Sequence, residues 1–396
     1  MARLYTKRKL KKSACILLAL LLLVMLAAAM AACQNLADIE DVPVAEPEPP
    51  AEIVLNFAAV GDNLIHGPIY RGAKEAAGDA GFNFEPAYKA ILPLIEGYDL
   101  VCINQETPLG GTELGLSSYP NFNSPQELGD FLHSAGFNLI SHANNHILDK
   151  GSKGMRATLE YWQKYSDIAV AGAYLNKEAA ESTHILEKRG VKTALLAYTY
   201  GTNGITLPAG SELQVALIDK DQIAHDVAKA RVAADVVVVC MHWGNEYQTK
   251  PTQEQQDLAQ YLADLGVDIV VGAHPHVIQE MATLTGANGN ETLVAYSLGN
   301  FISSQNKPET MLGGMLKAQI VYSPATGEVK VQNGRFIPLV THYDKDYKNV
   351  RILPFADYTE EMAAAHGIKA KASGFNKAFL QELLNRIVSS EYLAMD

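Results

Sequence analysis

Histidine, aspartate, asparagine and glutamate gather in six short segments of the sequence. The segments are AAVGDNLIH, VCINQETPL, ISHANNHILDKG, VVVVCMHWGNEY, VVGAHPHVIQ and YSLGNF. They hold six of the eleven histidines: His66, His142, His146, His242, His274 and His276. Imidazole and carboxylate donors together suit zinc, manganese or iron better than magnesium or calcium. These residue types predict a site for divalent metal ions.

Taken singly, the segments have simpler explanations. Asp62 could cap a helix or form a turn, and Asn144-Asn145-His146 could be a polar loop without chemistry. A single histidine at a strand end, such as His242, is more often a hydrogen-bonded structural side chain than a ligand. A shared site requires that all six segments end at one edge of a sheet, which depends on the elements that carry them.

Apolar runs precede the polar segments. They predict strands at 53–60, 100–103, 137–140, 168–171, 193–198, 235–241, 268–271 and 293–296. Segments with a helical period alternate with them at 124–135, 152–165, 219–233 and 252–266, and capping boxes are predicted at Ser124 and Thr252. A hairpin over 315–340 and a helix over 373–389 follow. This alternation predicts an α/β fold with its reactive groups just beyond the carboxyl ends of the strands.

The segment VVGAHPHVIQ places two histidines on either side of Pro275. In an extended segment, residues i and i+2 project to the same side, so His274 and His276 could both face a metal pocket. Pro275 fixes the local backbone and has no N–H group to leave unsatisfied. Two metals about 3.5–4 Å apart could each take one imidazole while a carboxylate bridges them.

The N-terminus has the layout of an export signal. A basic head precedes the apolar stretch Ala14–Ala32, which ends ahead of Cys33. The segment resembles a bacterial lipoprotein signal, so we expect cleavage before Cys33 and lipidation of its thiol, although Met30 stands where leucine is usual. An uncleaved anchor is the alternative, because the stretch is near the lower length limit for a membrane span. Either way, we expect the body to be extracytoplasmic and held at a membrane.

The expected organisation is a signal peptide at 1–32, an acidic Pro-rich tether at 33–52, a main domain at 53–345 and a C-terminal helical extension packed on the same domain at 346–396. The formal net charge is −12, and the basic head lies outside the expected mature body. A body this acidic should repel nucleic acid and bare anionic membrane. Beyond the signal, Cys102 and Cys240 lie in strand-like runs, where buried free thiols are expected and a disulfide between them is left open.

In order along the chain, VGDNLIHG, INQETPL, ANNHILDKG, MHWGNEY with the following PTQEQQDLAQYLADLGVDIVVGAHPHVIQ, and YSLGNF resemble the blocks of the bacterial capsule-synthesis CapA family, which is associated with poly-γ-glutamate. The resemblance covers residues 53 to 303. That family is similar in turn to the calcineurin-like metallophosphatases, which implies a four-layer α/β/β/α sandwich with a dinuclear metal centre.

The resemblance also implies roles for individual residues. Asp62 and His276 would bind the first metal, and Asn145, His242 and His274 the second. His146 would be the general acid, and Asn144 or Asn300 would orient the substrate.

Two positions depart from the phosphatase pattern. Leu64 stands where its first block has a histidine, and His66 follows two residues later. Asn104-Gln105-Glu106 replaces the Gly-Asp that supplies the bridging carboxylate, and Glu106 could bridge instead because its stem is longer. We therefore expect one weak metal site and one good one.

Three functions remain open at this point. The first is a lipid-tethered hydrolase or transferase with two Mn, Fe or Zn ions, acting on an anionic polymer, its precursor or a phosphoester. The second is a non-catalytic subunit of a polymer synthesis or export assembly that keeps the fold. A solute-binding lipoprotein is the third, although it does not require ligand-like clusters at so many strand ends.

Overall fold

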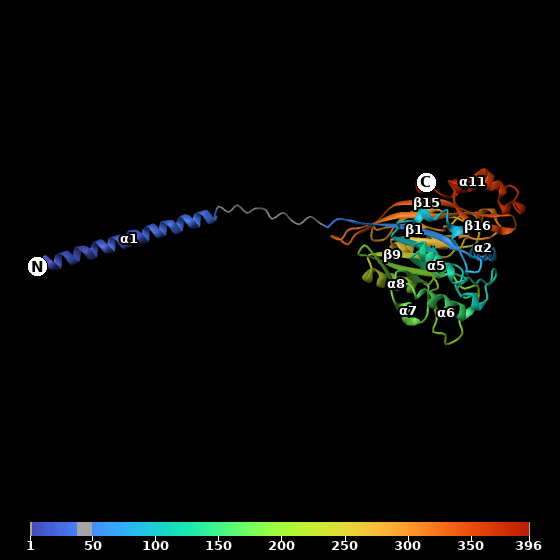
Figure 1. Cartoon of the computed structure of the whole chain (residues 1–396), viewed down its shortest axis with the longest axis horizontal. Coiled ribbons are helices and arrows are strands. Elements are labelled where there is room, and N and C mark those ends of the chain that lie inside the picture. Colours follow the sequence, from blue (N-terminus) through green and yellow to red (C-terminus); the bar gives the residue numbers. More distant parts are fainter. Residues whose placement is uncertain (1, 38–49, 396) are drawn as a thin grey trace. The chain divides into compact units, whose positions relative to one another are not determined.

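The structure, a computed structural model, describes residues 2–37 and 50–395 (Figure 1). The chain divides into two units, Met1–Pro49 and Pro50–Asp396. In the first unit, helix α1 spans Ala2–Ala37. Its segment Arg8–Gln34 is long and apolar enough to cross a membrane, a property that export signals share. Most of the expected tether, residues 38–49, lies outside the described residues.

The first sheet of the second unit is built around β1 (Ile53–Asn63). Three strands follow β1 in parallel on one side: β2 (Leu100–Asn104), β3 (Leu139–Ser141) and β4 (Ala169–Ala171). Three antiparallel strands lie on the other: β14 (Leu312–Tyr322), β15 (Val329–Asp344) and β16 (Lys348–Pro354). The short strand β13 (Asn300–Ile302) pairs with the end of β1. The carboxyl ends of β1 to β4 therefore share one edge.

The second sheet has a parallel centre formed by β7 (Val191–Thr199), β9 (Val236–His242), β10 (Ile269–Ala273) and β12 (Glu291–Ala295). Antiparallel strands close its two edges, β6 (His184–Lys188) and β11 (Met281–Thr285). A separate pair joins β5 (Ala173–Tyr174) and β8 (Gln214–Val215). The predicted strands are all confirmed, and their ends differ from the predictions by at most three residues.

The two sheets pack face to face on one apolar core, and strands of the second sheet alternate between this core and a second cluster. In β9, Val236, Val238 and Cys240 join the core between the sheets, together with Phe57, Ala59 and Cys102 of the first sheet. Val237, Val239 and Met241 point the other way, into a second cluster. An apolar strand with both faces buried is typical of a sheet covered on both sides.

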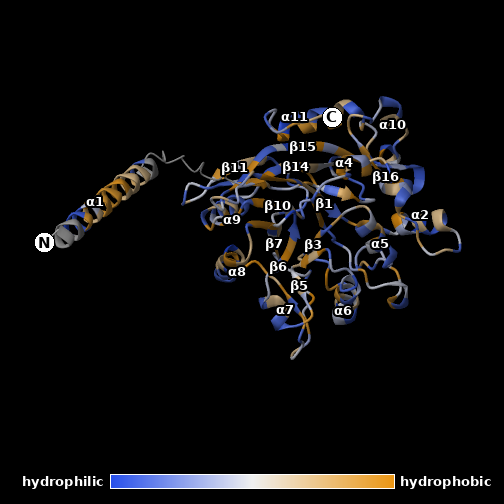
Figure 2. Ribbon diagram, turned by 60° about the vertical axis from the view of Figure 1, so that its left-hand side comes forward, coloured by the Kyte–Doolittle hydropathy of each residue, from blue (hydrophilic) through white to orange (hydrophobic). Residues whose placement is uncertain are grey.

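Helices cover the outer faces (Figure 2). On the second sheet these are α8 (Lys220–Ala233) and α9 (Gln253–Asp264), whose apolar residues complete the second cluster. On the first sheet, α2 (Gly67–Ala77), α3 (Glu85–Tyr88), α4 (Leu92–Ile95) and α5 (Glu127–Ser134) contribute to the main core. Helices α6 (Gly151–Trp162) and α7 (Lys177–Glu181) lie next to β5. The fold is the expected α/β/β/α sandwich.

The chain after β15 continues in the same core. β16 extends the first sheet, and α10 (Glu360–Ala365) and α11 (Lys377–Ile387) bury Ala363, Leu380 and Leu383 in the main cluster. Short 3-10 turns complete the described elements: η1 (Thr112–Leu114), η2 (Pro308–Met311), η3 (Lys345–Tyr347) and η4 (Gly367–Ala370).

One of the two predicted capping boxes is present. The Thr252 side chain accepts the backbone N–H of Gln255, and the Gln255 side chain accepts the backbone N–H of Thr252. The prediction for Ser124 is wrong, because α5 begins at Glu127 behind Gln126, which makes no side-chain cap. The Ser124 hydroxyl instead lies 2.8 Å from that of Thr107. A buried tertiary hydrogen bond thus replaces the local one.

Candidate functional site

The carboxyl ends of strands from both sheets meet at one place. Asp62 lies near the end of β1, and Glu106 follows β2 by two residues. From the other sheet, His242 ends β9 and His274 directly follows β10. All four side chains are at least 96% buried. The parallel strands of each sheet thus deliver their polar ends to a shared, buried position.

Asp62 and Glu106, together with His276, form what we call the acid–imidazole cluster. One ligand atom from each lies within 4.8 Å of the others. His276 Nδ1 lies 3.0 Å from Asp62 Oδ2, and His276 Nε2 lies 3.9 Å from Glu106 Oε1. Burial lowers the pKa of His276, but the negative charges of Glu106 and Asp62 outweigh it and raise that pKa to about 9.

Glu106 is the least satisfied member of the cluster. Both of its carboxylate oxygens are buried without a hydrogen-bond partner. Burial, followed by the charge of Asp62, raises the pKa of Glu106 well above its usual value. A buried carboxylate without donors is costly unless a positive charge compensates it. The donor set around Glu106 therefore fits a divalent cation.

Asp62 is held in place by donors from both sheets. The Asn104 amide donates to Oδ1 at 2.8 Å, and the backbone N–H of His274 lies 3.3 Å from each carboxylate oxygen. Asn104 Nδ2 also lies 3.4 Å from His242 Nδ1. Asn104 thus connects the acid–imidazole cluster to the neighbouring histidines.

A second group, which we call the amide–imidazole group, consists of Asn145, His242 and His274. His242 Nε2 lies 3.0 Å from Asn145 Oδ1, and the rings of His242 and His274 are 4.7 Å apart. His274 Nδ1 is buried without a partner. Burial lowers the pKa of His274 to about 3, which keeps the imidazole neutral and able to bind metal.

The backbone that carries His274 and His276 is not extended, so that part of the prediction is wrong. β10 ends at Ala273, and the two histidines have φ values of 97° and 58°. Such values are uncommon for residues other than glycine, and they cluster at functional sites. A tight turn through Pro275 aims His276 at Asp62 while His274 lies beside His242. Both histidines therefore reach the site because of this strained turn, and not because of the alternation of side chains along a strand.

His146 lies beside these groups with its own carboxylate partner. Its Nδ1 atom lies 2.7 Å from Asp149 Oδ2, and the Phe122 ring meets the imidazole edge-on at 4.8 Å. The oxygen of Asp149 also accepts the backbone N–H of Phe122. The Asp149 contact leaves Nε2 as the ring nitrogen available for proton transfer.

Asn144 and Asn300, the predicted substrate-binding residues, are already engaged in the protein. Asn144 donates to the carbonyl of Gln105 at 3.0 Å and accepts the N–H of His146 at 3.1 Å. Asn300 pairs in register with Asp62, but its amide donates to Gln305 and to the carbonyl of Thr310. These bonds orient both residues within the protein.

The other two histidines of the six segments have different surroundings. His142 Nε2 lies 2.7 Å from Trp162 Nε1, and burial lowers the pKa of His142 to about 3. This is a structural histidine. His66 Nδ1 accepts the N–H of Ser304, and the ring meets Phe122 edge-on. Burial lowers the pKa of His66 to about 4, with smaller contributions from His276 and His146.

Sequence reasoning missed the residues at the rim. Tyr200 lies 4.5 Å from the His274 ring and is 49% exposed, and Asn203 accepts a hydrogen bond from Asn145. Both residues follow β7. The strand predicted at 193–198 was therefore the signal that could have located them. Near His276, the exposed Lys307 ammonium lies 3.3 Å from the centre of the Tyr247 ring, which is 6.1 Å from that of His276.

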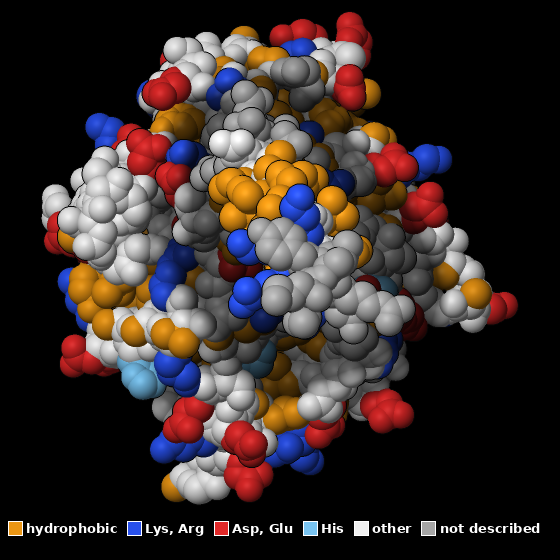
Figure 3. All heavy atoms as spheres, turned by 90° about the vertical axis from the view of Figure 1, so that its left-hand side faces the viewer, with side chains coloured by type: hydrophobic (Ala, Val, Ile, Leu, Met, Phe, Trp, Pro, Cys, Tyr) orange, Lys and Arg blue, Asp and Glu red, His pale blue; other side chains and the backbone are white. Residues whose placement is uncertain are grey.

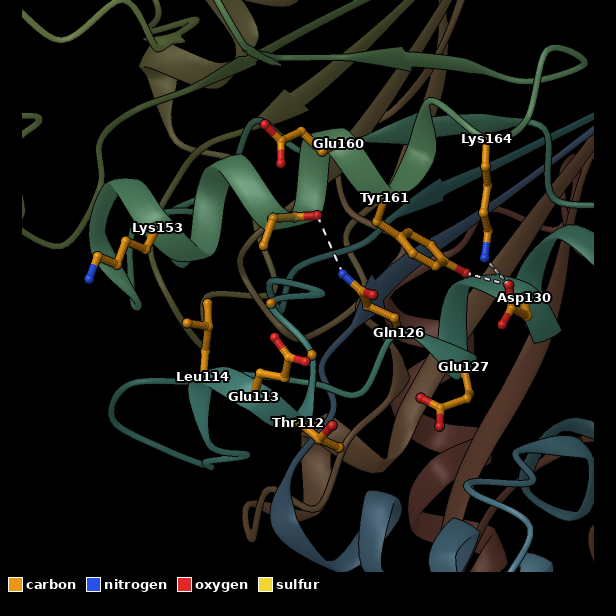
Figure 4. Close-up of a pocket in the computed structure, with 13 residues that line it drawn as sticks. Thr112, Glu113, Leu114, Gln126, Glu127, Asp130, Lys153, Glu160, Tyr161 and Lys164 are labelled. Carbon is orange, nitrogen blue, oxygen red and sulfur yellow. Dashed lines mark hydrogen bonds and ion pairs between the residues drawn. The ribbon is translucent and has the colours of Figure 1, made fainter.

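A separate cavity of about 690 Å³ lies between α5, α6 and the loop 110–114 (Figure 4). Its charged residues include Asp130, which pairs with Lys164 and accepts a hydrogen bond from Tyr161. None of the predicted site residues lines it. On the face shown in Figure 3, Asp and Glu side chains are spread around the outline among Lys and Arg.

Residues 56–305 match the family described as bacterial capsule synthesis protein PGA_cap. The PGA biosynthesis protein CapA of Bacillus subtilis (strain 168) is 30% identical over 275 residues, which is 65% of each chain. The capsule biosynthesis protein CapA of Bacillus anthracis is 28% identical over 65% of this chain and 61% of its own. The chain thus spans less than two thirds of the length of these relatives.

Among solved structures, a phosphatase of Mycoplasma pneumoniae is similar with a TM-score of 0.45 and 14% identity, over 73% of this chain and 95% of its own. The calcineurin-like phosphoesterase YfkN from Bacillus subtilis has a TM-score of 0.43 and 14% identity, over 84% and 99% of the two chains.

Proposed function

The chain belongs to the bacterial capsule synthesis protein PGA_cap family, and from this membership and the site geometry we propose that it is a membrane-held, extracytoplasmic protein of capsule or poly-γ-glutamate synthesis or export. Its site would use divalent metal ions to cleave a phosphoester or related bond, or to transfer the group it joins. The substrate would be an anionic polymer or its precursor.

The observation that carries this proposal is the state of Glu106. Its two unpartnered, buried oxygens lie in the same cluster as Asp62 and His276. These three residues would hold one ion, and Asn145, His242 and His274 a second. Bound Mn, Fe or Zn would polarise the substrate oxygen and lower the pKa of a bound water.

His146 would act on the leaving group. Hydrogen bonding of Nδ1 to Asp149 fixes the orientation of the ring. Nε2 can then give its proton to the departing oxygen. The Phe122 ring, perpendicular to the imidazole at 4.8 Å, would restrict water around His146. Asn144 positions His146 by accepting its backbone N–H.

The rim would select an anionic substrate. Lys307 provides a positive charge beside Tyr247, within a chain whose formal net charge is −12. Local attraction of this kind is needed because the remaining charge repels anions at long range. Tyr200 adds a half-exposed aromatic ring beside His274.

The N-terminal segment would hold the protein at the membrane. A single apolar helix precedes the folded unit, and its apolar part ends near Cys33. Processing before Cys33 and lipidation of its thiol would leave the folded unit outside the cytoplasm on an acidic tether. The retained helix itself would serve the same purpose if it is not cleaved.

A non-catalytic role in polymer assembly is the second candidate. One observation favours it: Leu64 occupies the place of a phosphatase histidine and is buried, which leaves the acid–imidazole cluster with one imidazole. A site with a weak first metal could bind polymer ends or stabilise the fold without turnover.

The test is turnover by the purified full chain in detergent. The panel contains phosphomonoesters, phosphodiesters and γ-linked glutamate polymer, with released phosphate and glutamate as the readout. Wild type should turn over one class, and His146→Ala should lower kcat by roughly 10²–10⁴-fold with metal content unchanged. His133→Ala is the matched control, because His133 forms a surface pair with Asp167. Loss of polymer from deletion cells without any turnover in vitro would favour the assembly role.

A further inference from the structure

Two residue pairs face each other across the sheets in one register. Cys102 Sγ of β2 lies 3.4 Å from Cys240 Sγ of β9. One pleat further along both strands, Asn104 Nδ2 lies 3.4 Å from His242 Nδ1. Both pairs are separated by 138 residues in the sequence. The thiol pair therefore belongs to the same aligned interface as the metal-type site.

The two thiols are enclosed by the apolar core. Cys102 is fully buried and Cys240 is 5% exposed, and both belong to the cluster between the sheets. The other cysteines, Cys15 and Cys33, lie in the N-terminal helix. Each buried thiol thus has the other as its sulfur neighbour. A disulfide between them requires no cysteine from another part of the chain.

We propose that Cys102 and Cys240 are a modification site: they form a disulfide that joins the two sheets directly beneath the acid–imidazole cluster. The sulfur atoms need only approach by an amount on the order of 1 Å to reach bonding distance. In the reaction, both thiols lose their protons and a small-molecule or protein disulfide accepts the two electrons, which releases two thiols of the oxidant. An oxidising, extracytoplasmic compartment supplies oxidants of this class.

The position of the bond gives it a consequence for the site. Asn104 and Glu106 follow Cys102 on the same strand end, and His242 follows Cys240 by two residues. A covalent link between β2 and β9 fixes the separation of these two strand ends. It also closes a long loop, which restricts the unfolded chain. The inference does not depend on catalysis, because it requires only the fold and an oxidant.

The first test is a thiol map of the full chain in detergent, after unfolding and refolding with oxidised glutathione. Free thiols are blocked with iodoacetamide in denaturant, the protein is reduced, and the new thiols are labelled with N-ethylmaleimide. Mass spectrometry of peptides should find N-ethylmaleimide on Cys102 and Cys240, and a linked pair of peptides before reduction. Iodoacetamide on both residues after this treatment would overturn the proposal.

The second measurement separates a disulfide from mere packing of two thiols. Reductant should lower the thermal midpoint of oxidised wild type by an amount on the order of 5 °C. Cys102→Ala and Cys240→Ala should show no dependence on reductant, whereas Cys15→Ala should behave like wild type. Equal midpoints for wild type with and without reductant would contradict the cross-link. If the core variants do not fold, the peptide map of wild type still decides the matter.

Discussion

The Nδ1 atom of His276 lies 3.0 Å from Oδ2 of Asp62, although 214 residues separate them in the sequence. The contact joins the first strand of one sheet to a turn that follows a strand of the other. It also couples the charge of the imidazole to two buried carboxylates, since Glu106 lies on the far side of the same ring. A proton and the proposed metal ion would therefore compete for His276.

This competition predicts a pH dependence of the metal-free protein. The pKa of His276 is raised to about 9 in the fold, from about 6.5 when unfolded. Its stabilising contribution is thus fully present below pH about 6.5 and is lost as the pH rises through about 9. The free energy of unfolding of chelator-treated protein should fall in that window by an amount on the order of 2 kcal/mol. Denaturant titrations with and without metal measure it, and metal-loaded protein that loses as much stability would contradict the interpretation.

Replacement of Glu106 should change metal binding and metal-free stability in opposite directions. Glu106→Gln removes a buried charge without donors, so the metal-free protein should be as stable as wild type or more stable. The same change removes a ligand, and metal affinity should fall at least about 10-fold. Metal analysis and thermal unfolding of the same samples measure both effects. Glu246→Gln, at an exposed position, is the control; an equal loss of affinity there would point to a general charge effect.

A methyl group at position 61 should disturb the site without touching a ligand. A Cβ atom on Gly61 would lie 1.9 Å from the carbonyl oxygen of Gly299, so β1 and the chain before β13 would have to separate. Gly61→Ala should destabilise the protein by about 2–4 kcal/mol and weaken metal binding through Asp62. Gly72→Ala in α2 meets nothing within 4 Å and should be neutral or stabilising. Calorimetry measures the stability of both variants. A Gly61→Ala protein as stable as wild type would show that the backbone there can move to make room for the methyl group.

The charge of Lys307 should govern substrate capture. Lys307→Ala should raise KM for an anionic substrate several-fold at low ionic strength and leave kcat unchanged, because the ammonium lies at the rim and not among the buried ligands. Added salt should reduce the difference between variant and wild type. Steady-state kinetics at two ionic strengths provide the measurement, with the exposed Lys345→Ala as control. A change in kcat alone would assign Lys307 a different role.

The strands and their polar ends could be predicted from the sequence because buried strands are long apolar runs, and β9 is apolar along almost its whole length. The meeting of Asp62 with His276 was expected at the edge of a single sheet, but β1 and β10 belong to different sheets, so the contact depends on how the two sheets pack. The turn at His274 could not be predicted, since its positive φ depends on tertiary contacts that hold the strained backbone. Tyr247 ends the segment VVVVCMHWGNEY, but its contact with Lys307 is made by long-range packing and could not be predicted.

The distance along the chain between Asp62 and His276 would affect which ion fills the proposed metal site. A polypeptide that is delivered across a membrane from its N-terminus presents the aspartate long before the histidine, so no partly delivered chain holds a complete set of donors. Divalent ions bind such donors with strengths that follow a general order rather than the needs of the protein. For the proposed extracytoplasmic metal site, the ions dissolved where the last strand docks would therefore decide the metal.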